Sequence, residues 1–472
     1  MKVNPSTTLR IDGKRSQAIN NANSKINLSI FKSRDIRGIY PSELNEEIAY
    51  KIGRAFVVKT RVKEVAIGRD MRLSSPALFQ AFSKGVLDQG ANVFDLGEVP
   101  VEYLYFMAGM RNGFESGVMI TASHNPKEHN GFKMVKKRRK IVEVERGKDL
   151  ISIIKKNKFP EPKNEGKMES VEFSSEFIEH IFSFIDKNKI KPLKIAVDAG
   201  NGMAGKIIPL LAEKLPLEIL PLNFILDGNF PAHASNPLVE GASDQVAKTV
   251  VEERADFGFM FDGDADRIFL IDESGNFIKG DTTLLLLAKY LLKKYPGKGI
   301  AYNLICSKAT PEFIKKWGGK PLRTAVGVAE VRESMMKKDG IMGGELSGHY
   351  LFQDNFYLDS GFVVFLILLE IISESNKKVS ELIKELSPYV KAAEINFKVC
   401  NKEKILKEIK KKYSDGKQDF LDGITVDYDN WWFNIRPSQT ESLLRLTMEA
   451  QNQPLLEEKK KELIHLIEKT AF

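Results

Sequence analysis

Residues 257–271 read Phe-Gly-Phe-Met-Phe-Asp-Gly-Asp-Ala-Asp-Arg-Ile-Phe-Leu-Ile, so three aspartates and an arginine stand between two short apolar runs. Neither run shows a helical period, and both have the length and composition of buried strands, which predicts a tight acidic loop between two strands. Three carboxylates this close raise one another's pKa and resist joint ionisation. If Asp262, Asp264 and Asp266 all stay ionised, the loop is expected to hold a hard divalent cation.

Three other interpretations compete for this loop. A calcium loop of the helix-loop-helix kind would use the three aspartates and Glu273, but it needs glycine where Arg267 stands and helices where strands are predicted. A phosphatase of the haloacid-dehalogenase type also places Asp-x-Asp after a buried strand, but it normally continues into Gly and Thr or Val, whereas Ala265-Asp266 follows here. An acidic surface turn explains one or two aspartates, not three with an arginine.

Bulk properties limit the class of protein. The chain has 472 residues, enough for about three or four domains of ~100–200 residues, and a globular composition. The longest uncharged apolar stretch, Phe362 to Leu369, is far shorter than the ~18 residues of a membrane span. Residues 1–27 lack an apolar signal region, so we expect a flexible extension on a cytoplasmic protein. Cys306 and Cys400 lack a paired spacing, which indicates buried, inert thiols rather than disulfides or zinc ligands.

The formal net charge of +8 fits nucleic acid, an anionic surface or an anionic small ligand. Most lysines alternate with glutamates on amphipathic stretches such as Leu455 to Ile464, the pattern of a solvated helix face. The one concentrated run, residues 136–140, is expected to be a solvated hairpin, or secondarily to attract a phosphorylated ligand. Because no nucleic-acid motif accompanies it, a small anionic substrate is favoured over nucleic acid or a membrane.

Apolar strand-like runs alternate along the chain with helix-length segments. Strands are expected at Val65–Gly68, Ala91–Leu96, Gly117–Thr121, Ile195–Val197 and Ala301–Ile305, and helices at Ser75–Gln89, Gly205–Leu215 and Asp281–Lys294. This alternation predicts α/β layers with largely parallel sheets.

Breaks in composition suggest where the domains end. A stretch with Pro and Gly, Lys155–Lys167, reads as a linker, a helical segment begins near Asp281, and a third break lies near Ser387-Pro388. The terminal unit that follows is smaller and contains the pair Trp431-Trp432. The expected domains are residues 28–167, 168–277, 278–387 and 388–472.

A second motif, Thr121-Ala122-Ser123-His124-Asn125-Pro126, follows a predicted strand. A serine at the exit of a strand lies at the carboxyl edge of a sheet, where α/β proteins bind ligands. Ser and Asn before Pro are also ordinary turn and cap residues, and the Gly-x-Ser-x-Gly elbow of serine hydrolases is missing. Beside a divalent cation, however, a phosphorylated serine would be a good phosphoryl donor. The two motifs together therefore indicate phosphoryl transfer.

Two further segments would suit a phosphosugar. The loop Gly343-Gly344-Glu345-Leu346-Ser347-Gly348-His349 presents a carboxylate, a hydroxyl and an imidazole, which fits sugar hydroxyls. The turn Arg436-Pro437-Ser438-Gln439-Thr440 presents a guanidinium and two hydroxyls, which fits a phosphate dianion. Each segment alone reads as an ordinary loop. A cation site, a serine that can carry phosphate, a sugar-binding loop and a phosphate-binding turn in one chain argue against coincidence.

In this order, the motifs resemble those of the α-D-phosphohexomutase superfamily, and within it the bacterial and archaeal phosphomannomutase/phosphoglucomutase group. The resemblance covers almost the whole chain from Phe31 and is carried by Asp35-Ile36-Arg37-Gly38, Gly68-Arg69-Asp70 with Ser74-Ser75-Pro76, Thr121 to Pro126 with Asn130-Gly131-Phe132-Lys133, Asp198-Ala199-Gly200-Asn201-Gly202, Asp262 to Arg267, Gly344 to His349 and Arg436 to Thr440. It implies four domains around a central cleft, namely three related α/β domains with mixed sheets and a smaller α+β C-terminal domain.

The resemblance also implies residue roles. Ser123 would carry the phosphate, and Mg²⁺ would be bound by Ser123 with Asp262, Asp264 and Asp266. The transfer site would contain Ser123, His124, Lys133 and Arg37, and the substrate would be held by Arg267, Glu345, Ser347, His349, Arg436, Ser438, Gln439 and Thr440. Lys133 is the preferred general acid/base, which requires neighbouring cations and burial to lower its pKa, and a static phosphate contact is the other reading.

The implied reaction interconverts the 1-phosphate and 6-phosphate of mannose or glucose. It passes through phosphoserine and a hexose 1,6-bisphosphate, which is both intermediate and activator, in a monomer or homodimer. Departures from the family pattern at Arg34, Val328, Gln439 and Ser442 leave the sugar undecided, whereas Leu346 resembles the mannose/glucose enzymes. The alternatives are a phosphoglucosamine mutase, a metal-dependent sugar-phosphate phosphatase and a catalytically idle binding protein.

Overall fold

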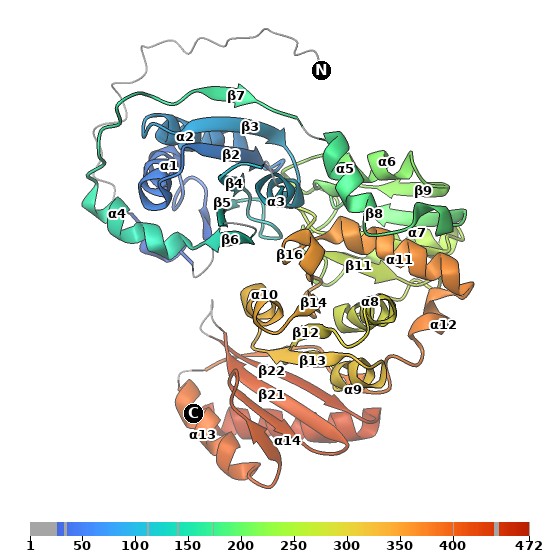
Figure 1. Cartoon of the computed structure of the whole chain (residues 1–472). Helices are drawn as coiled ribbons and strands as arrows, with labels where there is room; N and C mark the ends of the chain where they lie inside the picture. Colours follow the sequence, from blue (N-terminus) through green and yellow to red (C-terminus); the bar gives the residue numbers. More distant parts are fainter. Residues whose placement is uncertain are drawn as a thin grey trace.

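The computed structural model describes residues 26–32, 35–110, 113–138, 141–172, 174–399, 401–438 and 443–471. The predicted N-terminal extension lies outside these residues as far as residue 25, as do Arg34, Cys400, Gln439, Thr440 and Ser442. Four sheets follow one another along the described chain (Figure 1). No described helix combines the length and the hydropathy needed to cross a membrane.

The first sheet has seven strands in the order β1-β5-β4-β2-β3-β7, and β6 pairs with β5. Its strands are β1 (Ile36–Ile39), β2 (Glu64–Arg69), β3 (Asn92–Glu98), β4 (Ser116–Ile120), β5 (His129–Arg138), β6 (Ile141–Glu145) and β7 (Met168–Ser170). Its helices are α1 (Glu46–Thr60), α2 (Ser75–Leu87), α3 (Val101–Gly109) and α4 (Ile151–Lys156). β7 pairs in parallel with β3, so this sheet extends three residues past residue 167, where the sequence placed the boundary.

The second and third sheets have four and five strands and are also mixed, with the orders β11-β10-β8-β9 and β13-β12-β14-β15-β16. The second contains β8 (Leu193–Asp198), β9 (Leu217–Leu222), β10 (Phe257–Phe261) and β11 (Ile268–Ile271), with helices α5 (Ser174–Phe182), α6 (Ala204–Ala212) and α7 (Asp244–Glu252). The third contains β12 (Gly299–Asn303), β13 (Lys320–Thr324), β14 (Gly340–Gly344), β15 (Tyr350–Phe352) and β16 (Leu358–Asp359), with helices α8 (Gly280–Lys294), α9 (Ala309–Lys316), α10 (Val328–Lys337), α11 (Gly361–Ser375) and α12 (Val379–Ile383).

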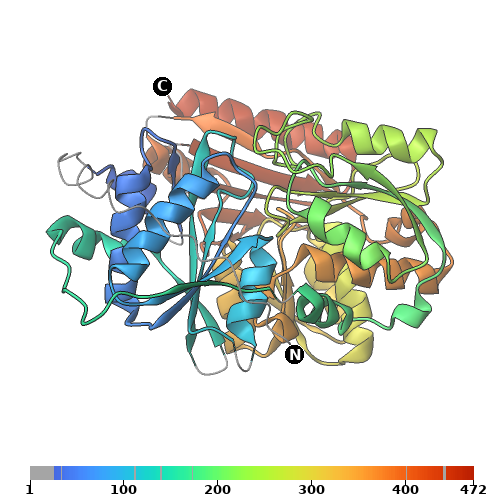
Figure 2. The same ribbon diagram turned by 90° about the horizontal axis from the view of Figure 1, so that it is seen from above.

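The fourth sheet has six strands, and all of its pairs are antiparallel. It contains β17 (Val390–Lys391), β18 (Ile395–Lys398), β19 (Lys417–Asp419), β20 (Ile424–Asp427), β21 (Trp431–Pro437) and β22 (Leu443–Ala450), with α13 (Lys402–Lys412) and α14 (Gln453–Ala471). Figure 2 shows α14 running along this sheet. The antiparallel sheet corrects the expectation of largely parallel sheets for this part of the chain, and it agrees with the α+β C-terminal domain.

One apolar core joins the first three sheets. Phe177 of α5 packs edge-on against Tyr103 of α3 and Phe362 of α11, with ring centroids 5.1 and 6.4 Å apart. Phe362 also contacts Phe261 of β10 at 5.6 Å. Because three units share buried aromatic rings, the loops at their strand ends are held close to one another.

A buried carboxylate adds a polar link to this core. Glu102 of α3 accepts hydrogen bonds from the Ser360 hydroxyl and from the backbone N–H groups of Gly361 and Phe362, at the first turn of α11. Glu102 is 3% exposed, and burial raises its pKa, while these hydrogen bonds act to lower it. The first unit is thus tied to the N-terminus of a helix that follows the third sheet.

Replacing Glu102 with alanine is expected to destabilise the protein by about 1–3 kcal/mol, because it leaves buried N–H groups without an acceptor. The shift should appear in urea unfolding followed by circular dichroism. Glu102→Gln, which keeps one acceptor oxygen, should lose less. An alanine variant as stable as the unmodified protein would show that the link contributes nothing.

Candidate functional site

Ser123 lies in the loop after β4, at the carboxyl end of the first sheet. Its φ is +51°, in the left-handed region that non-glycine residues rarely adopt. The Thr121 hydroxyl accepts a hydrogen bond from Ser123 N at 2.9 Å. Ser123 Oγ donates to Asp262 Oδ2 at 3.1 Å and lies 3.1 Å from His124 Nδ1. The first unit therefore presents its serine directly to the acidic loop of the second.

The acidic loop joins β10 and β11, the two strands that the sequence predicted. Arg267 closes the loop, since its backbone N and its Nε donate to the Asp262 carboxylate at 3.2 and 2.9 Å. Gly263 permits a close approach to the serine loop, because a Cβ there would lie 2.9 Å from Ser123 O. All three aspartates are buried, and each offers an oxygen within 4.8 Å of the others.

Lys133 and Arg37 come from β5 and β1 of the first sheet. Lys133 Nζ donates to Asp264 Oδ2 at 2.7 Å and to Asp266 Oδ2 at 2.6 Å. Arg37 Nη1 donates to Ala122 O, within the serine loop, at 3.1 Å. Both cations therefore lie at the junction between the serine loop and the acidic loop.

The pKa of Lys133 is raised well above its ordinary value. Burial acts to lower this pKa, but the neighbouring carboxylates of Asp264 and Asp266 outweigh burial. A general acid/base would need the opposite shift. In this arrangement Lys133 is a countercharge of the acidic loop, so its acid/base role stays a prediction that requires it to leave these carboxylates first.

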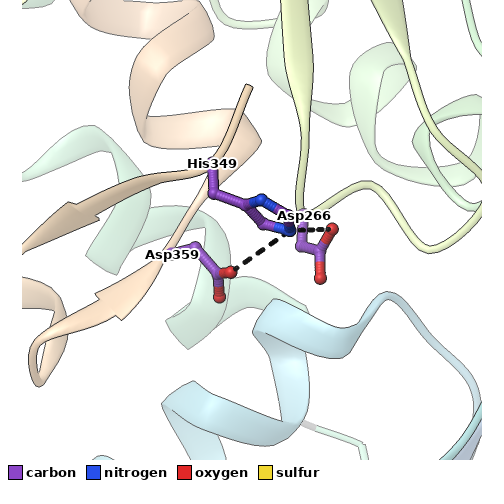
Figure 3. Close-up of side chains that lie close together, drawn as sticks. All are labelled: Asp266, His349 and Asp359. Atoms are coloured by element: carbon purple, nitrogen blue, oxygen red, sulfur yellow. Dashed lines mark ion pairs between the residues drawn. The ribbon is translucent and has the colours of Figure 1, made fainter. Parts of the chain in front are cut away.

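His349 meets two carboxylates from different parts of the chain (Figure 3). Its Nε2 lies 3.5 Å from Asp266 Oδ1 and 3.9 Å from Asp359 Oδ2. Burial lowers the pKa of His349, but the charges of Asp266 and Asp359 raise it above its ordinary value. Burial and the Asp266 charge in turn raise the pKa of Asp359. This group therefore connects the acidic loop to the third sheet.

Glu345 is oriented by two neighbours, of which Asn303 was not indicated by the sequence. Its Oε1 accepts hydrogen bonds from Asn303 Nδ2 at 3.0 Å and from Gly327 N at 2.9 Å. Ser347 Oγ lies 3.4 Å from Glu345 Oε2 and 3.0 Å from His349 Nδ1. The three residues predicted to bind the sugar thus form one hydrogen-bonded group at the end of the third sheet.

The described hydrogen bonds of Arg436, in the predicted phosphate loop, stay within the fourth unit. The described contacts of Arg436, on β21, are an ion pair with Glu394 at 2.6 Å and weaker hydrogen bonds to Asn434 and Thr447. Ser438 N donates to Leu443 O, across the loop. Gln439 and Thr440 lie outside the described residues. Their proposed contact with phosphate therefore stays a prediction.

The acidic loop fits a divalent cation. Asp264 Oδ1 and Asp266 Oδ1 are buried and accept no hydrogen bond from the described residues. Burial and the Asp266 charge raise the pKa of Asp262. Carboxylate oxygens at this spacing are the hard ligands that Mg²⁺ prefers.

Several interpretations are corrected by the structure. The calcium-loop reading is wrong, because strands flank the acidic loop and Glu273 instead accepts hydrogen bonds from Ser380. The described part of the basic run, residues 136–138, lies on β5 opposite the start of β4 and therefore at the far end from the serine loop. Lys136 and Arg138 are engaged by Thr60 O and by Glu143, which fits the hairpin reading. Cys306 is buried as predicted.

Family models match the chain in four consecutive parts. Domains I, II and III of phosphoglucomutase/phosphomannomutase, each described as an alpha/beta/alpha domain, match residues 28–161, 175–275 and 279–389. The C-terminal domain of the same family matches residues 394–466.

Individual proteins are similar over nearly the whole chain. A phosphomannomutase of Vibrio cholerae is 39% identical over 460 residues, which cover 94% of this chain and 99% of that protein. A solved phosphoglucomutase/phosphomannomutase family protein of Burkholderia thailandensis superposes with a TM-score of 0.86 at 31% identity, covering 94% and 98% of the two chains. An Aspergillus fumigatus N-acetylphosphoglucosamine mutase, solved with glucose 1,6-bisphosphate, shares the fold with a TM-score of 0.59 at 14% identity, covering 96% and 97% of the two chains.

Proposed function

The chain belongs to the phosphoglucomutase/phosphomannomutase family and is a mutase, and from this premise we propose that it works through a phosphorylated Ser123 and a hexose 1,6-bisphosphate. One observation carries the proposal. Ser123 Oγ, from the first unit, lies 3.1 Å from Asp262 of the second, at a junction that also contains Lys133 and His349. A phosphate on this oxygen would face the acidic loop.

The proposed cycle has two transfers. The O6 hydroxyl of a hexose 1-phosphate attacks the phosphorus on Ser123, the bond from phosphorus to Oγ breaks, and the O6 proton passes to a basic side chain. The bisphosphate then turns within the site, Ser123 Oγ attacks the phosphorus at C1, the bond from that phosphorus to O1 breaks, and O1 takes the proton from the basic side chain, which releases the 6-phosphate. Lys133 is our candidate for the proton transfer, and Arg37 and His124 would flank the transferring group.

Asp262, Asp264 and Asp266 would hold Mg²⁺ together with the phosphate on Ser123, and the ion would neutralise charge on the transferring group. Arg267, which already clamps Asp262, would keep the loop in shape and face the substrate. Its pairing with the loop argues for a positioning contribution in addition to the predicted contact with the phosphosugar.

We assign the sugar from the third loop and from the similar proteins. Glu345 and Ser347 form a hydrogen-bonded pair suited to vicinal hydroxyls, and mannose is the first choice because the Vibrio relative is a phosphomannomutase. A coupled assay with mannose, glucose and glucosamine 1-phosphates, with free phosphate monitored in parallel, tests this. We expect 6-phosphate to form fastest from mannose or glucose without release of free phosphate. Stoichiometric free phosphate would instead identify a phosphatase.

Arg436→Ala is expected to raise KM for the hexose phosphate by about 10-fold or more, because a charge-assisted phosphate contact contributes about 1.5–3 kcal/mol. Arg445→Ala is the matched control, since Arg445 also pairs with Glu394. It should change KM much less. Equal effects of the two substitutions on KM would mean that the ion pair of Arg436 with Glu394 only stabilises the sheet. Steady-state kinetics decide between these outcomes.

A further inference from the structure

The backbone of Ser123 is held in an unfavourable conformation. Residues other than glycine rarely adopt the left-handed region, so the surrounding structure must impose the φ of +51° on Ser123. The Thr121 hydroxyl engages Ser123 N, and this contact holds one side of the residue. The other side, Ser123 O, accepts a hydrogen bond from Arg72 Nη2 at 2.7 Å.

Arg72 lies in the loop after β2, and its side chain is fully buried. Its guanidinium makes five hydrogen bonds, which use all of the N–H groups that an arginine offers. Four reach the serine loop and its continuation, at the carbonyls of Ser123 (2.7 Å), Asn125 (2.7 Å), Pro126 (2.8 Å) and His129 (3.1 Å), and the fifth reaches Asp70 (3.1 Å). One planar group therefore fixes the path of the chain from Ser123 to the start of β5.

The second unit packs against this arginine. The ring of Phe230 lies 5.0 Å from the Arg72 guanidinium carbon. Gly228 approaches the same backbone so closely that a Cβ there would lie 2.8 Å from Arg72 Cα. Ser235 Oγ, in the same connection after β9, donates to Asn125 O at 3.2 Å. The clamp on the serine loop is thus completed by the unit that carries the acidic loop.

We propose that Arg72 is a positioning residue that keeps Ser123 in the conformation from which Oγ reaches the acidic loop, with Phe230 as its cover. This rests on the proposed role of Ser123 as phosphate carrier. Arg72 contacts backbone carbonyls and Asp70, not the reacting oxygen, so it acts through the geometry of the loop. A lysine offers three donors from one point and cannot reach four carbonyls at once.

Arg72→Ala and Arg72→Lys are expected to lower kcat by about 10²-fold, the cost of a displacement of about 1 Å at a reacting atom, while KM for the hexose phosphate stays close to its original value. Millimolar guanidinium should restore part of kcat in Arg72→Ala, because it refills the planar donor site. Arg69→Lys is the matched control. Arg69 pairs with Asp95 on the same sheet and packs on Phe79, so kcat should be unchanged and insensitive to guanidinium.

Phe230→Leu keeps Arg72 and removes only its aromatic cover, so it tests the same geometry if the Arg72→Ala protein does not fold. It should lower kcat more than it raises KM. The inference is overturned if folded Arg72→Lys and Phe230→Leu both keep the original kcat, or if all losses follow unfolding measured by circular dichroism. Failure of the proposed function would look different, because the unmodified protein would then take up no phosphate on Ser123 from glucose 1,6-bisphosphate.

Discussion

Ser123→Ala is expected to lower turnover of hexose phosphates by at least about 10⁴-fold, since removal of a covalent nucleophile is among the most severe losses an enzyme can suffer. The substitution deletes the hydroxyl oxygen that lies 3.1 Å from Asp262 Oδ2. Its effect should fall on kcat, because the sugar-binding pair Glu345 and Ser347 is left intact. Steady-state kinetics with mannose and glucose 1-phosphates measure it.

Ser347→Ala is the matched control for this prediction. It also removes one hydroxyl from the same site, but Ser347 is expected only to bind the sugar, so the loss should be far smaller and should include a rise in KM. If Ser123→Ala retained activity comparable with that of Ser347→Ala, Ser123 would not be the phosphate carrier.

Asp264→Asn is expected to weaken Mg²⁺ activation by at least about 10²-fold, because even the indirect partners of metal ligands typically cost 10–100-fold when lost. The substitution removes a charge from a buried oxygen set in which Asp264 Oδ1 and Asp266 Oδ1 accept no hydrogen bond. It also removes the negative charge that pairs with Lys133. The Mg²⁺ concentration for half-maximal activity, measured after treatment with a chelator, reports the change.

Asp272→Asn is the control for Asp264→Asn. Asp272 is buried at the end of the same hairpin, where it accepts hydrogen bonds from Ser274 N and Asn276 N, outside the acidic cluster. The Mg²⁺ concentration that the Asp272→Asn variant needs for half-maximal activity should match that of the unmodified protein. Full activity of the unmodified protein in excess chelator would show that the reaction does not need a divalent cation.

The sequence predicted those parts of the site that local pattern controls. The acidic loop was found because two apolar strands flank it, and Ser123 because it follows a buried strand. The four α/β and α+β units were expected from the order of the motifs. The predicted family, fold class and mutase activity are confirmed.

Long-range partners were not visible in the sequence. Arg72 follows the recognised Gly68-Arg69-Asp70 motif by two residues, yet its carbonyl partners lie 51 to 57 residues away, and no local period announces them. Asp359 and Asn303 were missed for the same reason, since each becomes meaningful only through His349 or Glu345. Their one shared signal, a polar residue at the end of a buried strand, is common in α/β proteins.

The charge state of Lys133 shows a second limit of prediction from the sequence. The sequence-based role required a lowered pKa, but the fold places Lys133 on Asp264 and Asp266, which raise its pKa. The sequence contains both charges without the distances of 2.7 and 2.6 Å that decide the sign of the shift. Pairings of this kind depend on how two sheets dock, which no motif encodes.

Transfer of phosphate to Ser123 is the central claim, and it can be measured directly. The purified protein is incubated with Mg²⁺ and glucose 1,6-bisphosphate, and its peptides are mapped by mass spectrometry before and after addition of mannose 1-phosphate. We expect one phosphate, on Ser123, and because each turnover returns a phosphate to Oγ, Ser123 should still carry it after mannose 1-phosphate has been converted to mannose 6-phosphate. Turnover of hexose phosphates by a protein that never carries phosphate on Ser123 would contradict the account.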